Sequence, residues 1–274
     1  MKARIISGVL GSSLLVVAIA FNKLFPILIN IIIALAALTC VVEILVARGL
    51  LKNLKISVPA MAFAGLFPIL ISTVYWPVLF VLFILSLFVM LVFFHQEILI
   101  ADIAFTFTTS LLITAGLSSI VMLCDQDRSH TGFNITMSLI IPWMADAGAY
   151  FIGSFFGRYK LCPEISPNKT VEGPLGGVLF GVVGALADAI VFQIWLFPGS
   201  EQICYINLVL IAFLCAVVSI IGDLSFSLIK RSCHVKDYGS VIPGHGGILD
   251  RCDSVIFAAP LLLVYVQYFP IMVM

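Results

Sequence analysis

Charged residues are scarce in this sequence. Of its 274 residues only 10% are Asp, Glu, Lys or Arg, whereas 62% are hydrophobic and the mean hydropathy is +1.21. Soluble domains are about 25% charged and about 45–50% apolar, so the composition excludes a soluble globular domain. The 14 basic and 14 acidic residues cancel, and the chain therefore lacks the basic field that would indicate nucleic acid as a partner.

Metal-binding cysteine patterns and internal repeats are also missing. The seven cysteines, at positions 40, 124, 162, 204, 215, 233 and 252, form no CxxC pair and no metal-ligand spacing. Several stand within apolar runs, which favours small buried side chains over metal or redox chemistry. The longest polar connections are residues 157–170 and 225–252, so function is expected in these two loops and the helix ends beside them.

Apolar runs of about 20 residues, the length that crosses a bilayer, recur along the chain. They predict an all-α, polytopic integral membrane protein with about nine transmembrane helices, at 5–21, 24–47, 56–73, 76–95, 98–123, 134–156, 171–197, 203–224 and 253–273. With the N-terminus in the cytoplasm and the C-terminus outside, only Lys23 and Arg128 among the basic residues lie outside, in agreement with the positive-inside rule. Spans 1–5 would form one region, 1–130, and spans 6–9 the functional region, 131–274.

Several carboxylates fall within the predicted spans, where each costs about 2.5–3.5 kcal/mol on insertion scales and needs a partner, an aqueous cavity or a role. They are Asp102, Asp146, Asp188 and Asp223, with Glu43 and Glu97 nearer to span ends. For Asp188, a functional cavity and a protonated carboxyl hydrogen-bonded to a neighbouring helix remain equal alternatives. Asp146 stands in a row of small residues, 145–149, that permits close approach of a helix or a ligand.

The segment 166–174, Ser-Pro-Asn-Lys-Thr-Val-Glu-Gly-Pro, leads into the seventh span. Its hydroxyls, its lysine and the unsatisfied N–H groups of a helix start would favour a bound phosphate. An ordinary helix cap, Ser or Thr followed by Glu, is the alternative interpretation. The glycines and prolines at 173–177 are candidates for a lateral opening, although they are more typical of close helix packing.

The densest polar cluster spans residues 222–253. Asp250 and Asp253 are three residues apart and share a helix face, and Asp223 ends the preceding span, where it could converge with them. Hard oxygen ligands surrounded by Lys and Arg suit Mg²⁺ holding a polyphosphate better than zinc. His245 could donate to phosphate, act as a base or order the loop. A solvated basic loop would explain the cations, but not the acidic triad.

From Ser227 to Asp253 the sequence resembles the C-terminal signature of the phosphatidate cytidylyltransferases, or CDP-diacylglycerol synthases. That signature runs S-x-hydrophobic-K-R, then K-D-x-small, then H-G-G-hydrophobic-x-D-R-x-D, and every fixed position matches. The resemblance covers roughly residues 140–257. Ala145, Ala147 and Asn168 depart from the family pattern, which puts fine substrate contacts in doubt more than the reaction.

The resemblance implies transfer of CMP from CTP to phosphatidate, giving CDP-diacylglycerol and pyrophosphate in phospholipid biosynthesis. The partners would be CTP, phosphatidate in the bilayer and membrane lipids, at the cytoplasmic face of a bacterial inner membrane, and a homodimer is left open. The implied cofactor is Mg²⁺, with a second cation left open. The implied site consists of catalytic Asp223, Asp250, Lys230, Arg231 and His245; substrate-binding Ser166, Asn168, Lys169, Thr170, Ser227, Lys236, Asp237, Gly246, Gly247 and Arg251; and metal-binding Asp146, Asp223, Asp250 and Asp253.

Two other functions remain as alternatives. A related membrane cytidylyltransferase or kinase that acts on an isoprenoid or ether lipid phosphate would use nearly the same chemistry. An ion-coupled transporter would also explain intramembrane Asp residues and glycine-broken helices. A transporter should show inverted repeats and charges at the membrane midplane, whereas these charges concentrate at one predicted edge.

Overall fold

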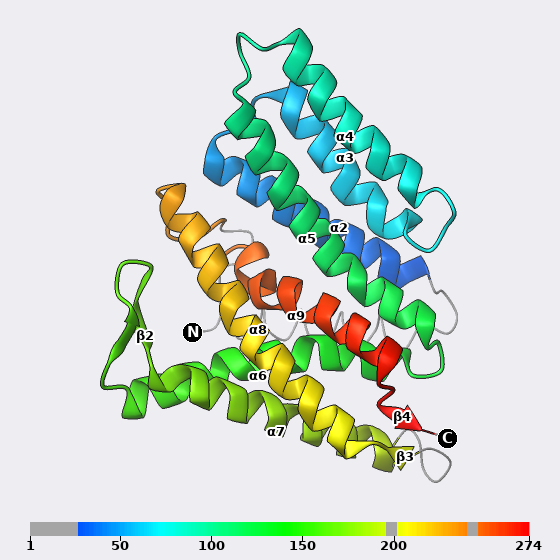
Figure 1. Cartoon of the computed structure of the whole chain (residues 1–274), viewed down its shortest axis with the longest axis vertical. Helices are drawn as coiled ribbons and strands as arrows, with labels where there is room; N and C mark the ends of the chain where they lie inside the picture. The colour runs from blue at the N-terminus through cyan, green and yellow to red at the C-terminus, as the bar shows by residue number, and fades with distance from the viewer. Residues whose placement is uncertain (1–26, 196–201, 240–245, 274) are drawn as a thin grey trace. The chain divides into compact units, whose positions relative to one another are not determined.

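The computed structural model describes residues 27–195, 202–239 and 246–273, and these residues are mostly helical (Figure 1). The helices are α2 (Ile27–Arg48), α3 (Leu54–Leu70), α4 (Trp76–Phe93), α5 (Ile100–Gln126), α6 (Thr131–Phe156), α7 (Glu172–Trp195), α8 (Tyr205–Ser232) and α9 (Leu249–Tyr268). Two short antiparallel strand pairs join β1 (Lys160–Cys162) to β2 (Ser166–Thr170) and β3 (Gln202–Ile203) to β4 (Met272–Val273).

These helices correspond to eight of the predicted spans, while the first predicted span, 5–21, lies outside the described residues. Six of them, α2 and α4 to α8, are long and apolar enough to cross a membrane. The chain is therefore a multi-pass membrane protein, as the apolar runs predict. α3 is a shorter apolar helix of 17 residues, and α9 begins with the charged residues Asp250, Arg251 and Asp253.

Two predicted helix boundaries are wrong, and one predicted loop contains strands. α8 does not end near 224 but continues to Ser232, so the first part of the predicted loop 225–252 is helical. α9 begins at Leu249 rather than 253, and the predicted loop 157–170 contains the β1–β2 hairpin. Hydropathy detects only the apolar part of a helix, whereas the backbone hydrogen bonds of the helix continue through polar residues. Ser225, for example, fits within α8 because its hydroxyl donates to the carbonyl of Ile221 at 2.8 Å.

The chain divides into two compact units, one formed by residues 1–126 and 232–252, the other by 127–231 and 253–274. In the first unit α3 packs against α2, α4 and α5. The rings of Phe63 and Phe83 stack with centroids 4.3 Å apart. Gly49 follows the end of α2, and its positive φ of 79° suits glycine; the N–H of Leu50 then donates back to the carbonyl of Leu45 at 2.8 Å.

In the second unit α6 and α7 lie side by side (Figure 1). A Cβ added at Gly148 would lie 2.5 Å from the carbonyl oxygen of Gly176, and a Cβ added at Gly176 would lie 2.7 Å from that of Gly148. The two helix backbones therefore touch at positions that only glycine can occupy. This contact explains the glycines near 148 and 176 by close helix packing.

Asp188 also finds its partner between these two helices. The hydroxyl of Thr136 on α6 donates to Oδ2 of Asp188 on α7 at 2.8 Å, and Asp188 is 8% exposed. Of the two alternatives for this residue, the geometry favours a carboxyl hydrogen-bonded to a neighbouring helix.

Candidate active site

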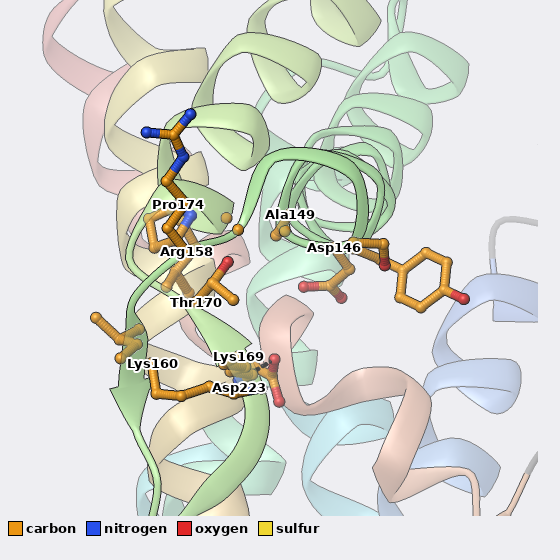
Figure 2. A pocket seen from close by; sticks show the side chains of 15 residues that line it. Asp146, Ala149, Arg158, Lys160, Lys169, Thr170, Pro174 and Asp223 are labelled. Carbon is orange, nitrogen blue, oxygen red and sulfur yellow. Dashed lines mark ion pairs between the residues drawn. The ribbon is translucent and has the colours of Figure 1, made fainter.

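A cavity of about 620 Å³ opens in the second unit, between α6, the β1–β2 hairpin, α7 and α8 (Figure 2). Its volume is within the range of small-molecule sites. The charged residues that line it are Asp146 on α6, Arg158 after α6, Lys160 on β1, Lys169 on β2 and Asp223 on α8. Three basic and two acidic residues thus line one cavity.

Lys169 and Asp223 form an ion pair at the wall of this cavity (Figure 2). The contact joins the lysine Nζ to Oδ2 of the carboxylate, and each side chain is 27% exposed. The other oxygen, Oδ1, accepts a hydrogen bond from the hydroxyl of Ser227, one helical turn later, at 3.3 Å. Two segments that are 54 residues apart in the sequence thereby meet in one polar group.

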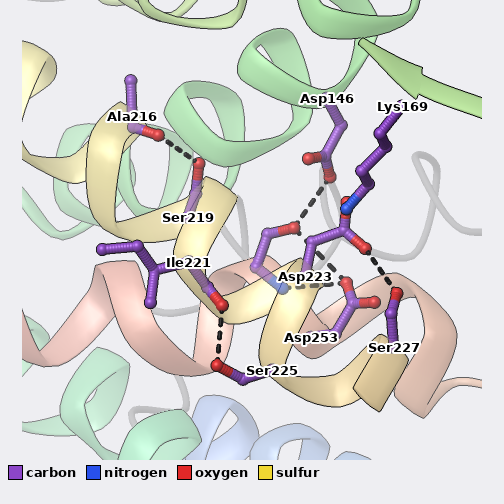
Figure 3. A network of polar contacts seen from close by, with 10 residues as sticks. Asp146, Lys169, Ala216, Ser219, Ile221, Asp223, Ser225, Ser227 and Asp253 are labelled. Atoms are coloured by element: carbon purple, nitrogen blue, oxygen red, sulfur yellow. Dashed lines mark hydrogen bonds and ion pairs between the residues drawn. The ribbon is translucent and has the colours of Figure 1, made fainter. Parts of the chain in front are cut away.

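Asp146 and Asp253 are joined through the hydroxyl of Ser254 (Figure 3). This oxygen lies 2.8 Å from Oδ2 of Asp146 and 3.3 Å from Oδ1 of Asp253, and the N–H of Ser254 also donates to Asp253 at 2.8 Å. Asp253 is 5% exposed, and the negative charges of Asp146 and Asp223 oppose its own. Three carboxylates from α6, α8 and α9 therefore act on one another electrostatically.

The β1–β2 hairpin carries the candidate residues of the predicted loop 157–170. Ser166, Asn168, Lys169 and Thr170 lie on β2, and Nε of Arg231, near the end of α8, donates to the carbonyl of Ile165 in the hairpin turn at 3.2 Å. Thr170 lines the cavity, and its buried hydroxyl has no hydrogen-bond partner within the described part of the chain. An orphaned hydroxyl at a cavity wall is suited to contact a ligand oxygen.

The carboxylates fit Mg²⁺ in their chemical type, because carboxylate oxygens are the ligands that Mg²⁺ prefers. Among residues 27–195, 202–239 and 246–273, no group of three His, Cys, Asp or Glu side chains is arranged to hold a metal ion. Asp223 is instead paired with Lys169, and Asp146 and Asp253 accept from Ser254. A cation bound by these carboxylates would have to replace some of these contacts.

Most of the remaining predicted site residues belong to the first unit. Oδ2 of Asp250 accepts the N–H groups of Tyr238 and Gly247, each at 3.0 Å. Gly246 has a positive φ of 84°, a conformation that favours glycine. Lys236, Asp237 and Arg251 are exposed, and His245 lies outside the described residues. Lys230 lies in the other unit, near the end of α8, where its charge attracts that of Asp253.

The structure adds residues that sequence reasoning did not select. Ser254 directly follows Asp253 in the sequence, and this adjacency is the signal that could have selected it as a site residue. Arg158 and Lys160, which line the cavity, were not among the predicted site residues. Glu43 was named among the carboxylates that need a partner but was not assigned to the site; it accepts hydrogen bonds from the N–H groups of Ile248 and Leu249, just beside Asp250.

Curated relatives share sequence with about half of the chain. A phosphatidate cytidylyltransferase of Bacillus subtilis is 47% identical over 128 residues, which are 47% of this chain and 45% of that protein. One of Synechocystis is 44% identical over 141 residues, 50% of this chain and 44% of that protein. One of Haemophilus influenzae is 36% identical over 160 residues, 58% of this chain and 54% of that protein. The chain spans about half the length of the curated relatives it matches.

The family comparison extends further along the chain. The profile described as "Cytidylyltransferase family" matches residues 2–269, and this range includes every residue of the cavity and of the Asp250 turn. The resemblance expected from the signature at 227–253 is therefore confirmed, and the chain belongs to the cytidylyltransferase family.

Proposed function

We propose that this protein is a phosphatidate cytidylyltransferase, which transfers CMP from CTP to phosphatidate and forms CDP-diacylglycerol and pyrophosphate. The observation that carries the proposal is the cavity lined by Arg158, Lys160 and Lys169 together with Asp146 and Asp223, in which Lys169 pairs with Asp223. Phosphatidate cytidylyltransferase is also the name of each relative reported above.

The reaction makes modest demands on acid–base catalysis. A phosphate monoester has a second pKa near 6, so the phosphate of phosphatidate is mostly ionised at neutral pH and can attack without a strong general base. One of its oxygens bonds to the α-phosphorus of CTP while the bond from that phosphorus to the pyrophosphate oxygen breaks. Since both reactants are polyanions, positioning and charge neutralisation should supply most of the catalysis.

The cavity residues can provide both positioning and charge neutralisation. Lys169 would exchange its contact with Asp223 for a phosphate oxygen, and Arg158 and Lys160 would neutralise further phosphate charge. The orphaned hydroxyl of Thr170 would donate to the same ligand. From the sequence signature, catalytic roles are proposed for Lys230, Arg231 and His245. Substrate binding is proposed for Ser166, Asn168, Ser227, Lys236, Asp237, Gly246, Gly247 and Arg251.

Mg²⁺ is proposed as the cofactor, with Asp146, Asp223 and Asp253 of the second unit as its ligands. Asp250 belongs to the first unit, and its part in the proposal depends on the sequence signature alone. When bound, the ion would neutralise phosphate charge and hold the polyphosphate in place. A second cation remains part of the same proposal.

The finer topology is proposed as well. It comprises nine transmembrane helices with the N-terminus in the cytoplasm, a supporting region at 1–130 and a catalytic region at 131–274. The site would then face the cytoplasm, where CTP is available, while the acyl chains stay in the bilayer. The relatives reported above come from bacteria, which supports an inner-membrane location. A homodimer is part of the same proposal.

The test uses purified full-length protein in detergent with phosphatidate, Mg²⁺ and CTP labelled on the α-phosphate. We expect label to move into lipid, and we expect Lys169→Gln to lower the rate by about 10²-fold or more, because it removes a cation from the phosphate site. Lys55→Gln is the matched control. Its lysine pairs with Glu97 at 2.6 Å in the other unit, and the exposed pair should affect transfer by less than about twofold.

Competing lipids separate the remaining functions. Faster labelling of an isoprenoid or ether lipid phosphate than of phosphatidate would reject phosphatidate as the substrate and keep the cytidylyltransferase chemistry. No labelling by folded protein, with several lipid phosphates and all four nucleotides, would reject the enzyme and favour the ion-coupled transporter.

A further inference from the structure

Glu43 is a buried carboxylate that the proposed mechanism does not use. It lies near the end of α2, five residues before Arg48, and is 4% exposed. A buried charge in an apolar helix is costly unless hydrogen bonds compensate for it. The groups that donate hydrogen bonds to Glu43 therefore indicate its role.

Both oxygens of Glu43 bind the start of α9. Oε1 accepts the N–H of Ile248 at 3.0 Å, and Oε2 accepts the N–H of Leu249 at 2.8 Å, across 205 and 206 residues of sequence. The first N–H groups of a helix have no partner within it, and the helix dipole favours a negative charge there. Glu43 thus caps the start of α9, which belongs to the same compact unit as α2.

The turn before α9 is shaped around this carboxylate. A Cβ at Gly247 would lie 2.5 Å from Oε2 of Glu43, and one at Gly239 would lie 2.6 Å from Oε1, so a side chain at either position would displace the carboxylate. The N–H of Gly247 meanwhile donates to Asp250 at 3.0 Å. The same turn therefore contacts Glu43 on one side and Asp250 on the other.

We propose that Glu43 is a positioning residue, which fixes the 246–249 turn and through it the carboxylate of Asp250. Its effect on catalysis rests on the proposed function, whereas its effect on the turn does not. A glutamine at this position keeps one acceptor but directs its NH₂ group at a backbone N–H. Such a pair of donors cannot bond, and the turn would loosen.

The experiment compares wild type, Glu43→Gln, Glu43→Asp and the control Asn30→Ala in detergent. Asn30 lies on the same helix, and its side-chain amide donates to the carbonyl of Pro68 at 3.0 Å, away from the turn. Hydrogen–deuterium exchange of the peptide that covers 246–252 reports on the turn without any substrate or metal. Labelled CMP transfer gives kcat and KM for CTP.

We expect Glu43→Gln to speed exchange in this peptide by about tenfold or more and to lower kcat by a similar factor, with KM for CTP changed by less than about threefold. Glu43→Asp keeps the charge and should recover part of both effects, and Asn30→Ala should change neither. Unchanged exchange in Glu43→Gln would overturn the proposal. So would equal losses in Glu43→Gln and Asn30→Ala, because these would indicate general damage to α2.

The two proposals fail in different ways. If wild type transfers no label, the proposed function fails, but the exchange comparison still decides whether Glu43 holds the turn. If wild type is active and Glu43→Gln loosens the turn without lowering kcat, the positioning role is overturned while the proposed function stands.

Discussion

Replacing Gly176 with alanine should separate α6 from α7. The added Cβ would lie 2.4 Å from Cβ of Ile152 and 2.7 Å from the carbonyl oxygen of Gly148. Ordinary van der Waals contact begins at 3.4 Å. A change of rotamer moves neither the Cβ of Ile152 nor a backbone oxygen, so the two helices would have to move apart by about 1 Å, the difference between these distances.

The cost of this movement can be worked out from packing. A gap of about 0.5–1 Å loses roughly a quarter to a half of the dispersion attraction of the facing atoms, and overpacking costs typically about 1–3 kcal/mol. Alanine recovers about 0.5–1 kcal/mol because it is the better helix former. We expect a net loss of about 1–2 kcal/mol in the free energy of unfolding, at roughly 2–4 °C of Tm per kcal/mol.

Thermal unfolding in detergent measures this effect, with Gly65→Ala as the matched control. Gly65 is inside α3, and the nearest atom to its added Cβ is Cδ2 of Leu38 at 4.0 Å. Gly65→Ala should therefore leave Tm unchanged or raise it, while Gly176→Ala lowers it. If both variants had a Tm equal to or above that of wild type, the close approach of α6 and α7 would be refuted.

Three further results are expected. Thr136→Val removes the donor to Asp188 and should lower the free energy of unfolding by about 1–3 kcal/mol; Asp188→Asn can still accept from Thr136 and should cost less in the same unfolding assay. Burial would raise the pKa of Asp127, but hydrogen bonds from Ser129 and His130 outweigh it and lower this pKa. The carboxylate therefore stabilises the fold above its unfolded pKa of about 4, and this contribution disappears as the pH falls through the folded value, so the Tm gap between wild type and Asp127→Asn should narrow on acidification. A constant gap would contradict this cause. Chelation of divalent cations should stop label transfer and added Mg²⁺ restore it; full transfer in chelator would reject the proposed cofactor.

Sequence determined the membrane class and the approximate position of the described helices. Both follow from local properties, because each apolar run must satisfy its backbone groups within itself when it crosses a bilayer. It also selected Asp146, Lys169, Thr170 and Asp223, which the structure places around one cavity. These side chains could be selected one by one, since polar groups stand out in an otherwise apolar sequence.

Tertiary structure decided which of these groups are partners. Ser254 joins Asp146 to Asp253, Lys169 pairs with Asp223, and Glu43 caps a helix that begins more than 200 residues later. Hydropathy and helical spacing describe a segment by itself and do not encode which face of another helix it meets. Only the packing of separate helices brings such distant carboxylates, hydroxyls and N–H groups within hydrogen-bond distance.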